Sequence, residues 1–158
     1  MKGKYWKYYL LWLFGNDIFL NANCLPDFIK KMPTEKRMEY EALYEQKPFL
    51  TRTEFYDLCQ DWAQKQGATI KKKYREYRLH EERYIKQRDQ VLRDRLDQVN
   101  GSNAAKNYLY ELLDLQSNMS ITLKVYETRE EEMRHYILDT VLQEATKIWN
   151  LLDPAHID

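Results

Sequence analysis

Residues 68–99 read ATIKKKYREYRLHEERYIKQRDQVLRDRLDQV, a run of 32 residues without glycine or proline. Apolar and aromatic side chains recur along it close to the 3.6-residue period of a helix. Charged side chains such as Glu81 and Arg88 interrupt this stripe, so part of the helix is expected to face water. At 1.5 Å per residue, the run predicts one helix of about 45 Å. Its apolar stripe consists of Ile70, Tyr74, Tyr77, Tyr84, Val91 and Leu92.

The composition of the whole chain also favours helices. Its 158 residues are enough for one domain with a sizeable core. Glycine and proline number only four each, and a β-sandwich or barrel needs a turn every ~8–12 residues. We therefore predict an all-α fold, a bundle of about five to six helices built from two helix–loop–helix units with a long central helix. After a short leader, the main helices are predicted over residues 34–47, 51–66, 68–99, 102–115 and 122–152.

The helix over 51–66 has a clear start and a clear apolar face. Thr51-Arg-Thr-Glu54 is a capping box, in which the Thr51 hydroxyl accepts a helix amide and Glu54 reaches back to the Thr51 amide. Phe55, Leu58 and Trp62 then fall on one face of the helix. We predict that this face is buried and that Trp62 anchors the core.

A weak internal echo supports the idea of two units. Residues 49–54 end one short helix and open another, and residues 118–122 have the same position later in the chain. Both segments contain threonine between a shorter and a longer predicted helix. Two such units are expected to pair their apolar faces in one bundle.

The amino terminus leaves two alternatives open. Residues 1–22 combine a basic start with a short apolar run, and they read either as a signal-like leader or as an aromatic N-terminal segment. Residues 23–158 are predicted to form a single helical domain. The apolar run is far below the ~18 residues that cross a bilayer, so we expect no transmembrane span. A secreted chain could join Cys24 to Cys59, whereas a cytoplasmic chain would keep both thiols free.

The charge balance argues against one class of partner. Basic and acidic residues number 25 each, so the chain as a whole offers no net attraction for nucleic acid. Residues 71–78 interleave lysine and arginine with tyrosine, a pattern that suits phosphate contact and base stacking. Tyr74 and Tyr77 fall on the apolar stripe of the long helix, however, and the cations then form its solvated face. We expect no nucleic-acid partner.

One stretch has the alternation of a calcium-binding loop. Counted from Asp114, alternate residues all carry side-chain oxygen, the ligand type of hard cations. The stretch has Met119 where the loop needs glycine and Val125 where it needs a bidentate glutamate. With one carboxylate, it predicts at most a weak, magnesium-like divalent-cation site. The candidate ligands are Asp114, Gln116, Asn118, Ser120 and Thr122.

No motif for catalysis or for a cofactor appears in the sequence. It has no glycine-rich phosphate loop and no Gly-x-Ser-x-Gly element. Its histidines, His80, His135 and His156, lack the spacing of zinc ligands. We therefore predict a protein that is not an enzyme, with no catalytic residue and no certain cofactor.

Several short motifs occur in a fixed order before the long helix. They are Leu25-Pro26, RMEYEA at 37–42, LTRTE at 50–54 and DWAQKQG at 61–67. In this order they resemble the nematode SXP/RAL family of secreted antigens and allergens, and the resemblance extends by pattern to about Trp149. It implies a small helical protein, secreted by nematodes, with a cation-binding domain of EF-hand-like helix pairs.

These features together predict a non-enzymatic, secreted, antigen-like helical protein. Its expected ligand is an unknown protein partner, a weakly bound divalent cation or a small apolar molecule. The alternative is an intracellular, cytoplasmic interaction module that acts through the long charged helix at 69–99.

Overall fold

The computed structural model describes residues 25–157, so the predicted leader at 1–22 and Cys24 lie outside the described residues. Within 25–157 the chain forms seven α-helices and one 3-10 helix, with a single isolated β-bridge. The all-α prediction is confirmed, with slightly more helices than the five to six expected. The elements are α2 (Asp27–Lys30), α3 (Thr34–Tyr44), η1 (Lys47–Phe49), α4 (Arg52–Lys65), α5 (Ala68–Gln98), α6 (Asn103–Ser117), α7 (Leu123–Tyr136) and α8 (Asp139–Leu152).

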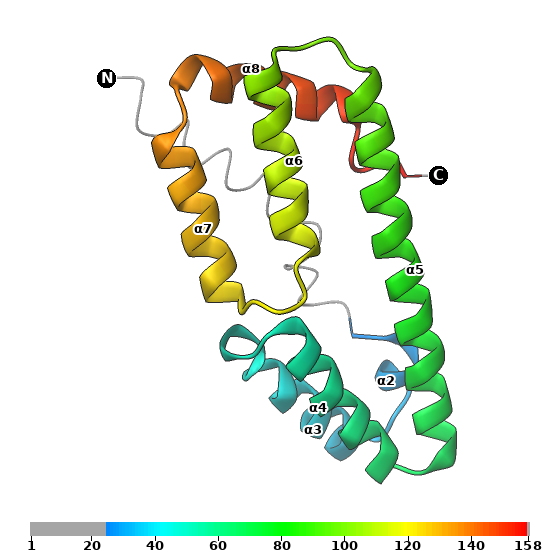
Figure 1. Cartoon of the computed structure of the whole chain (residues 1–158). Coiled ribbons are helices and arrows are strands. Elements are labelled where there is room, and N and C mark those ends of the chain that lie inside the picture. Colours follow the sequence, from blue (N-terminus) through cyan, green and yellow to red (C-terminus); the bar gives the residue numbers. More distant parts are fainter. Residues whose placement is uncertain (1–24, 158) are drawn as a thin grey trace.

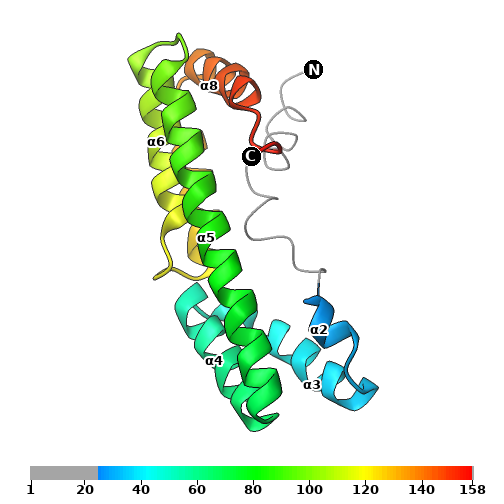
Figure 2. The ribbon, with the colours of Figure 1, turned by 90° about the vertical axis from the view of Figure 1, so that its right-hand side faces the viewer.

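The long helix α5 is the spine of the described structure (Figure 1). It follows Gly67, whose φ of 100° lies in the left-handed region that favours glycine, so the chain turns sharply between α4 and α5. One end of α5 packs on α4, and the other end packs on α6 and α8 (Figures 1 and 2). The predicted central helix is present, and it connects two groups of helices.

The first group of helices buries a largely aromatic core. The rings of Tyr40 and Trp62 lie 4.9 Å apart, and those of Tyr44 and Phe55 lie 5.1 Å apart. Such tilted and edge-on ring pairs stabilise a core beyond the area that they bury. The buried members of this core are Ile29, Tyr40, Phe55, Cys59, Trp62, Ala63 and Tyr74.

The second group buries a mainly aliphatic core between the carboxyl-terminal half of α5, α6 and α8. Leucines from all three helices interdigitate there around Trp149, which is 1% exposed. Its buried members are Leu92, Leu96, Ala105, Tyr108, Leu109, Leu112, Leu113, Leu142, Ala145, Ile148, Trp149 and Leu152.

The prediction of one helix over 122–152 is wrong. Ile137 and Leu138 are both extended, and the chain restarts as α8 in a new direction (Figure 1). No glycine or proline marks this break, so the local sequence contains no stop signal. The reason lies in packing, because the break lets α8 cross α5 and α6 and bury Trp149 and Leu152 in the second core.

The apolar residues Met38 and Ala42 do not form the buried face of α3. Met38 is 61% exposed, and Ala42 is exposed as well. The helix instead buries Tyr40, which packs against Trp62 and edge-on against Tyr44. A tyrosine ring buries far more apolar surface than an alanine methyl, and this difference decides which face turns inward.

The predicted capping box of α4 is formed. The Thr51 hydroxyl accepts the amide of Glu54 at 3.1 Å, and the Glu54 carboxylate accepts the amide of Thr51 at 2.8 Å. We expect Thr51→Ala to lower the free energy of unfolding by about 0.5–2 kcal/mol, because a helix amide loses its partner. Glu54→Ala should cost less, and urea denaturation of the double variant should reveal a coupling between the two changes.

A second cap supplies the control for this cycle. Ser102 starts α6 and accepts the amide of Ala105 at 3.2 Å, in the helix group at the far end of α5. Ser102→Ala and Glu54→Ala should therefore be additive. Equal additivity for the Thr51 and Glu54 pair would contradict a reciprocal box.

Trp62 is buried as predicted, with 8% of the residue exposed, and its indole Nε1 donates to Glu39 Oε2 at 3.1 Å. Trp62→Ala should lower the free energy of unfolding by about 3–5 kcal/mol in chemical denaturation, because it removes a ring from the centre of the aromatic core. The control is Phe49→Ala, at a side chain that is 79% exposed, which should change stability by less than about 0.5 kcal/mol. A similar small loss for Trp62→Ala would show that the ring does not support the core.

Candidate functional site

The two helix–loop–helix units meet at their loops. Thr51 and Thr122 form the isolated antiparallel bridge, and the amide of Thr53 donates to the carbonyl of Met119 at 3.2 Å. These are the two segments that the sequence relates by its internal echo. We call this contact the loop junction. It consists of residues 50–53, which span the end of the first loop and the start of α4, and of residues 116–122, which span the end of α6 and the second loop. It lies where the start of α4 meets the end of α6 and the start of α7 (Figure 1).

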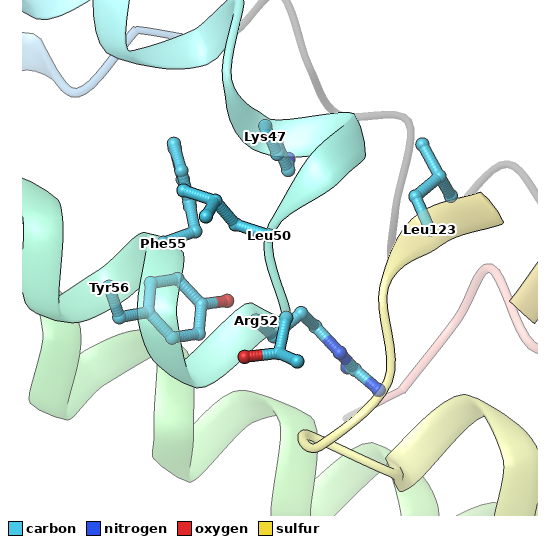
Figure 3. Close-up of a pocket in the computed structure, with 7 residues that line it drawn as sticks. Lys47, Leu50, Arg52, Phe55, Tyr56 and Leu123 are labelled. Carbon is cyan, nitrogen blue, oxygen red and sulfur yellow. The ribbon is translucent and has the colours of Figure 1, made fainter. Parts of the chain in front are cut away.

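Arg52 is the charged side chain at the centre of the loop junction. Only 6% of the residue is exposed. Its Nη2 donates to the main-chain carbonyls of Gln116 and of Asn118, the latter at 2.9 Å. Figure 3 shows the side chain reaching from the start of α4 toward the loop that precedes α7. The last carbonyls of a helix have no partner within it, so Arg52 satisfies groups at the end of α6 and complements their negative charge.

The first two candidate cation ligands lie on α6 rather than in the loop. The Asp114 carboxylate pairs with Arg93 of α5 at 2.7 Å and is 70% exposed. Gln116 is 3% exposed, and its side chain lies beside the phenol of Tyr126. For Asp114 to bind a divalent ion, its carboxylate would have to leave Arg93.

The other three candidate ligands lie in the loop, and they organise its backbone. The Asn118 side-chain oxygen accepts the amide of Ser120 at 2.9 Å, and the Thr122 hydroxyl accepts the amide of Val125 at 3.2 Å as the cap of α7. Across residues 25–157, no group of three or more His, Cys, Asp or Glu side chains gathers where it could hold a metal ion. The five predicted ligands thus lie near one another in the chain, but four of them use their side chains in contacts within the protein.

A tyrosine-lined cavity lies in the first core, next to the loop junction. Its volume is about 50 Å³, room for a few water molecules. The Lys47 ammonium lies on one side, 5.4 Å from the ring centre of Tyr44 and 5.5 Å from that of Phe55. The lining residues are Tyr40, Tyr44, Lys47, Phe55, Tyr56, Tyr74, Tyr77 and Glu81.

A smaller pocket separates the first loop from α7 and shares three lining residues with the tyrosine cavity (Figure 3). It has a volume of about 20 Å³, and Leu123 faces it from the far side. Ligand sites for drug-sized molecules are usually about 300–1,000 Å³. The pocket is lined by Lys47, Leu50, Thr51, Arg52, Phe55, Tyr56 and Leu123.

Sequence reasoning missed the tyrosine cavity and the role of Arg52. The tyrosines come from α3, α4 and α5, and each sits within its own helical stripe, so no local spacing connects them. The count of 13 tyrosines in 158 residues is the one signal that the sequence offers. Arg52 lies inside the capping box, where an arginine normally faces water.

Cys59 belongs to the same core as the cavity residues Tyr40 and Tyr74, and it is fully buried. Burial raises the pKa of Cys59 to about 12. The nucleophilic form of cysteine is the thiolate, so this thiol is poorly suited to covalent chemistry near neutral pH. The predicted Cys24–Cys59 bridge stays untested, because Cys24 lies outside the described residues.

Buried phenols make the fold sensitive to alkaline pH. Burial raises the pKa of Tyr44 from 10.0 to about 12, so the folded protein keeps a proton that the unfolded chain releases. Stability from this group is complete below pH 10 and is lost as the pH rises toward 12. In urea denaturation, we expect the free energy of unfolding to fall as the pH rises from 10 to about 12. Tyr44→Phe should reduce the slope of this fall by up to about 1.4 kcal/mol per pH unit.

The control for this experiment is Tyr136→Phe, at a ring that is 83% exposed. This change should leave the pH dependence of stability as it is in the wild type. An unchanged slope in Tyr44→Phe would show that water reaches the Tyr44 hydroxyl in the folded protein.

Comparisons of the chain with family models, with curated proteins and with solved structures find no match. Among residues 25–157, no helix combines the length and the apolar character that crossing a membrane requires. The resemblance to the SXP/RAL family therefore stays a prediction, and the geometry of the loop junction is the firmest basis for a functional proposal.

Proposed function

We propose that this chain is a non-enzymatic, secreted helical protein of the SXP/RAL type that binds a protein partner over its surface. The observation that carries the proposal is the pairing of two helix–loop–helix loops through Thr51 and Thr122. The resemblance implies EF-hand-like helix pairs, and the loop junction is an arrangement of that kind. The nematode origin and the secretion rest on the resemblance.

The cavities favour a partner that binds on the surface over an enclosed small ligand. The tyrosine cavity and the neighbouring pocket have volumes of about 50 and 20 Å³. An apolar cavity that binds benzene has a volume of about 150 Å³. A small apolar ligand would therefore have to push the first core apart, whereas a protein partner needs no preformed cavity.

The surface beside the loop junction offers a suitable contact. Phe49 belongs to η1, which packs against α7, and it is 79% exposed. Val125, near the start of α7, is 38% exposed. Aromatic side chains are enriched in protein interfaces and contribute strongly to their binding energy. With Lys47 lining the adjacent pocket, the expected partner presents an apolar side chain next to an acidic one.

The alternative of an interaction module built on the long helix receives less support. Tyr74, Leu92 and Leu96 of α5 are at most 2% exposed, because the two cores already use them. What α5 leaves for a partner is mainly its charged face. Solvated charges of this kind contribute little to binding energy.

A weakly bound divalent cation remains a secondary part of the proposal. Asp114 is the carboxylate that would hold it, and Arg93 competes for that carboxylate at 2.7 Å. Magnesium keeps several of its waters and tolerates few protein ligands. Any such binding should be weak and should depend on Asp114.

Expression of the full chain with its own amino terminus in a eukaryotic secretory host tests the proposal first. The protein should appear in the medium. A thermal-shift panel of the purified protein with octanoate and decanol should then show no rise in Tm, because a ligand that binds the native state stabilises it. The contrary result is a saturable rise in Tm with octanoate that is lost in Lys47→Met and kept in Lys86→Met, a variant at an exposed site. That result would make the protein a small-ligand carrier and contradict surface binding.

The surface itself is tested by capture from the fluid into which the protein is secreted. Wild type, Phe49→Ala and the control Tyr136→Ala should have the same Tm, because both aromatic side chains are largely exposed. We expect Phe49→Ala alone to lose the captured protein. If Tyr136→Ala loses the captured protein and Phe49→Ala keeps it, the interface lies instead at the corner between α7 and α8.

A further inference from the structure

Two of the predicted cation ligands do contact a positive charge, but they contact it through main-chain carbonyls and not through their side chains. Gln116 and Asn118 are neighbours in the alternating series that begins at Asp114. The Asn118 side-chain oxygen accepts the amide of Ser120, while the main-chain carbonyl oxygens of both residues accept from Nη2 of Arg52. The cation at the second loop is therefore the guanidinium of Arg52, a side chain from the start of α4.

The surroundings suit a charged guanidinium. Burial lowers the pKa of Arg52, yet an arginine side chain does not deprotonate in proteins. A buried charge is costly unless hydrogen bonds satisfy it, and the carbonyls at the end of α6 carry the negative end of the helix dipole. The guanidinium is planar and offers several fixed N–H donors, so one group can reach two carbonyls.

The contact is also part of a larger connection between the loops. Thr51, directly before Arg52, pairs with Thr122, and Thr53, directly after it, donates from its amide to Met119. Three consecutive residues at the start of α4 thus bind the second loop, and Arg52 is the only one of the three that brings a charge. Removal of its side chain would leave two carbonyls facing an empty, buried space.

We infer that the second loop is a cation site with a covalently attached occupant, the Arg52 guanidinium, and that the space vacated in a shortened variant binds guanidinium ions from solution. The ligand class is a small planar cation with several N–H donors. This inference is independent of the proposed function, because it requires neither secretion nor a partner.

The test is chemical rescue of Arg52→Ala. The variant should have a Tm several degrees below that of the wild type. Guanidinium or methylguanidinium chloride at low millimolar concentration should restore part of that loss in a saturable way, relative to sodium chloride at the same ionic strength. Tetramethylammonium has a charge but no N–H donor, and it should restore nothing.

Two further variants keep the test decisive. Glu54→Ala weakens the same helix start but retains Arg52, and guanidinium should not raise its Tm. Should Arg52→Ala fail to fold, Arg52→Gln keeps a polar side chain of intermediate length and leaves room for a small cation, so the same titration applies to it.

The inference is overturned if guanidinium leaves the Tm of both shortened variants unchanged, or raises that of Glu54→Ala equally. It is also overturned if calcium or magnesium restores Arg52→Ala as well as guanidinium does, because the vacated space would then accept a cation without planar donors. Amide NMR shifts at Ser117 and Met119 that saturate with the same midpoint as the Tm rescue would place the ion beside the two carbonyls.

Discussion

The end of α6 must find partners for its last carbonyls, and much of the arrangement of this protein depends on how it does so. Arg52 reaches these carbonyls from the start of α4, while Thr51 and Thr53 pair with the same loop. Because α4 packs on one end of α5 and α6 packs along its other half, this contact closes a ring of α4, α5, α6 and the loop junction. The two cores are thereby connected at a second point besides the long helix, and the amino end of one helix faces the carboxyl end of another, as their dipoles favour.

A second arginine, Arg95, also binds the carbonyls at the end of a helix, in the other group of helices. Nη1 of Arg95, on α5, donates to the carbonyl of Leu152 at 2.7 Å, and its Nη2 donates to that of His156 at 3.1 Å, just beyond the end of α8. In both places an arginine from a different helix completes a helix end that has no glycine to turn it. A chain with few glycines and many charges thus uses guanidinium groups where others use glycine caps. Part of its high charge content therefore holds the fold together instead of facing water.

The features that the sequence predicts are those that depend on neighbours in the chain. Helix α5, the capping box of Thr51 and the buried position of Trp62 follow from periodicity and local hydrogen bonding, and the structure contains all three. The break at Ile137 and the burial of the Tyr40 side chain depend on which helix faces pack together in the bundle. The local sequence does not determine that packing. The loop echo lies between these cases, because similar segments suggest pairing but do not specify which groups meet. The alternation from Asp114 predicts side-chain ligands, whereas Gln116 and Asn118 contribute their main-chain carbonyls to Arg52.

A buried charge often adds no more to the free energy of unfolding than well-packed apolar groups of similar volume would. What the guanidinium adds is geometry, because a rigid planar donor fixes the positions of two carbonyls relative to its own helix. At the loop junction this sets where the first loop lies against α7, and with it the separation of Leu50 and Leu123 across the small pocket. Phe49 immediately precedes that loop and is held at the surface by the same geometry. The exposed aromatic side chain proposed to meet a partner therefore directly precedes a loop that hydrogen bonds to the second loop hold in place, which reduces the ordering cost that binding would otherwise impose.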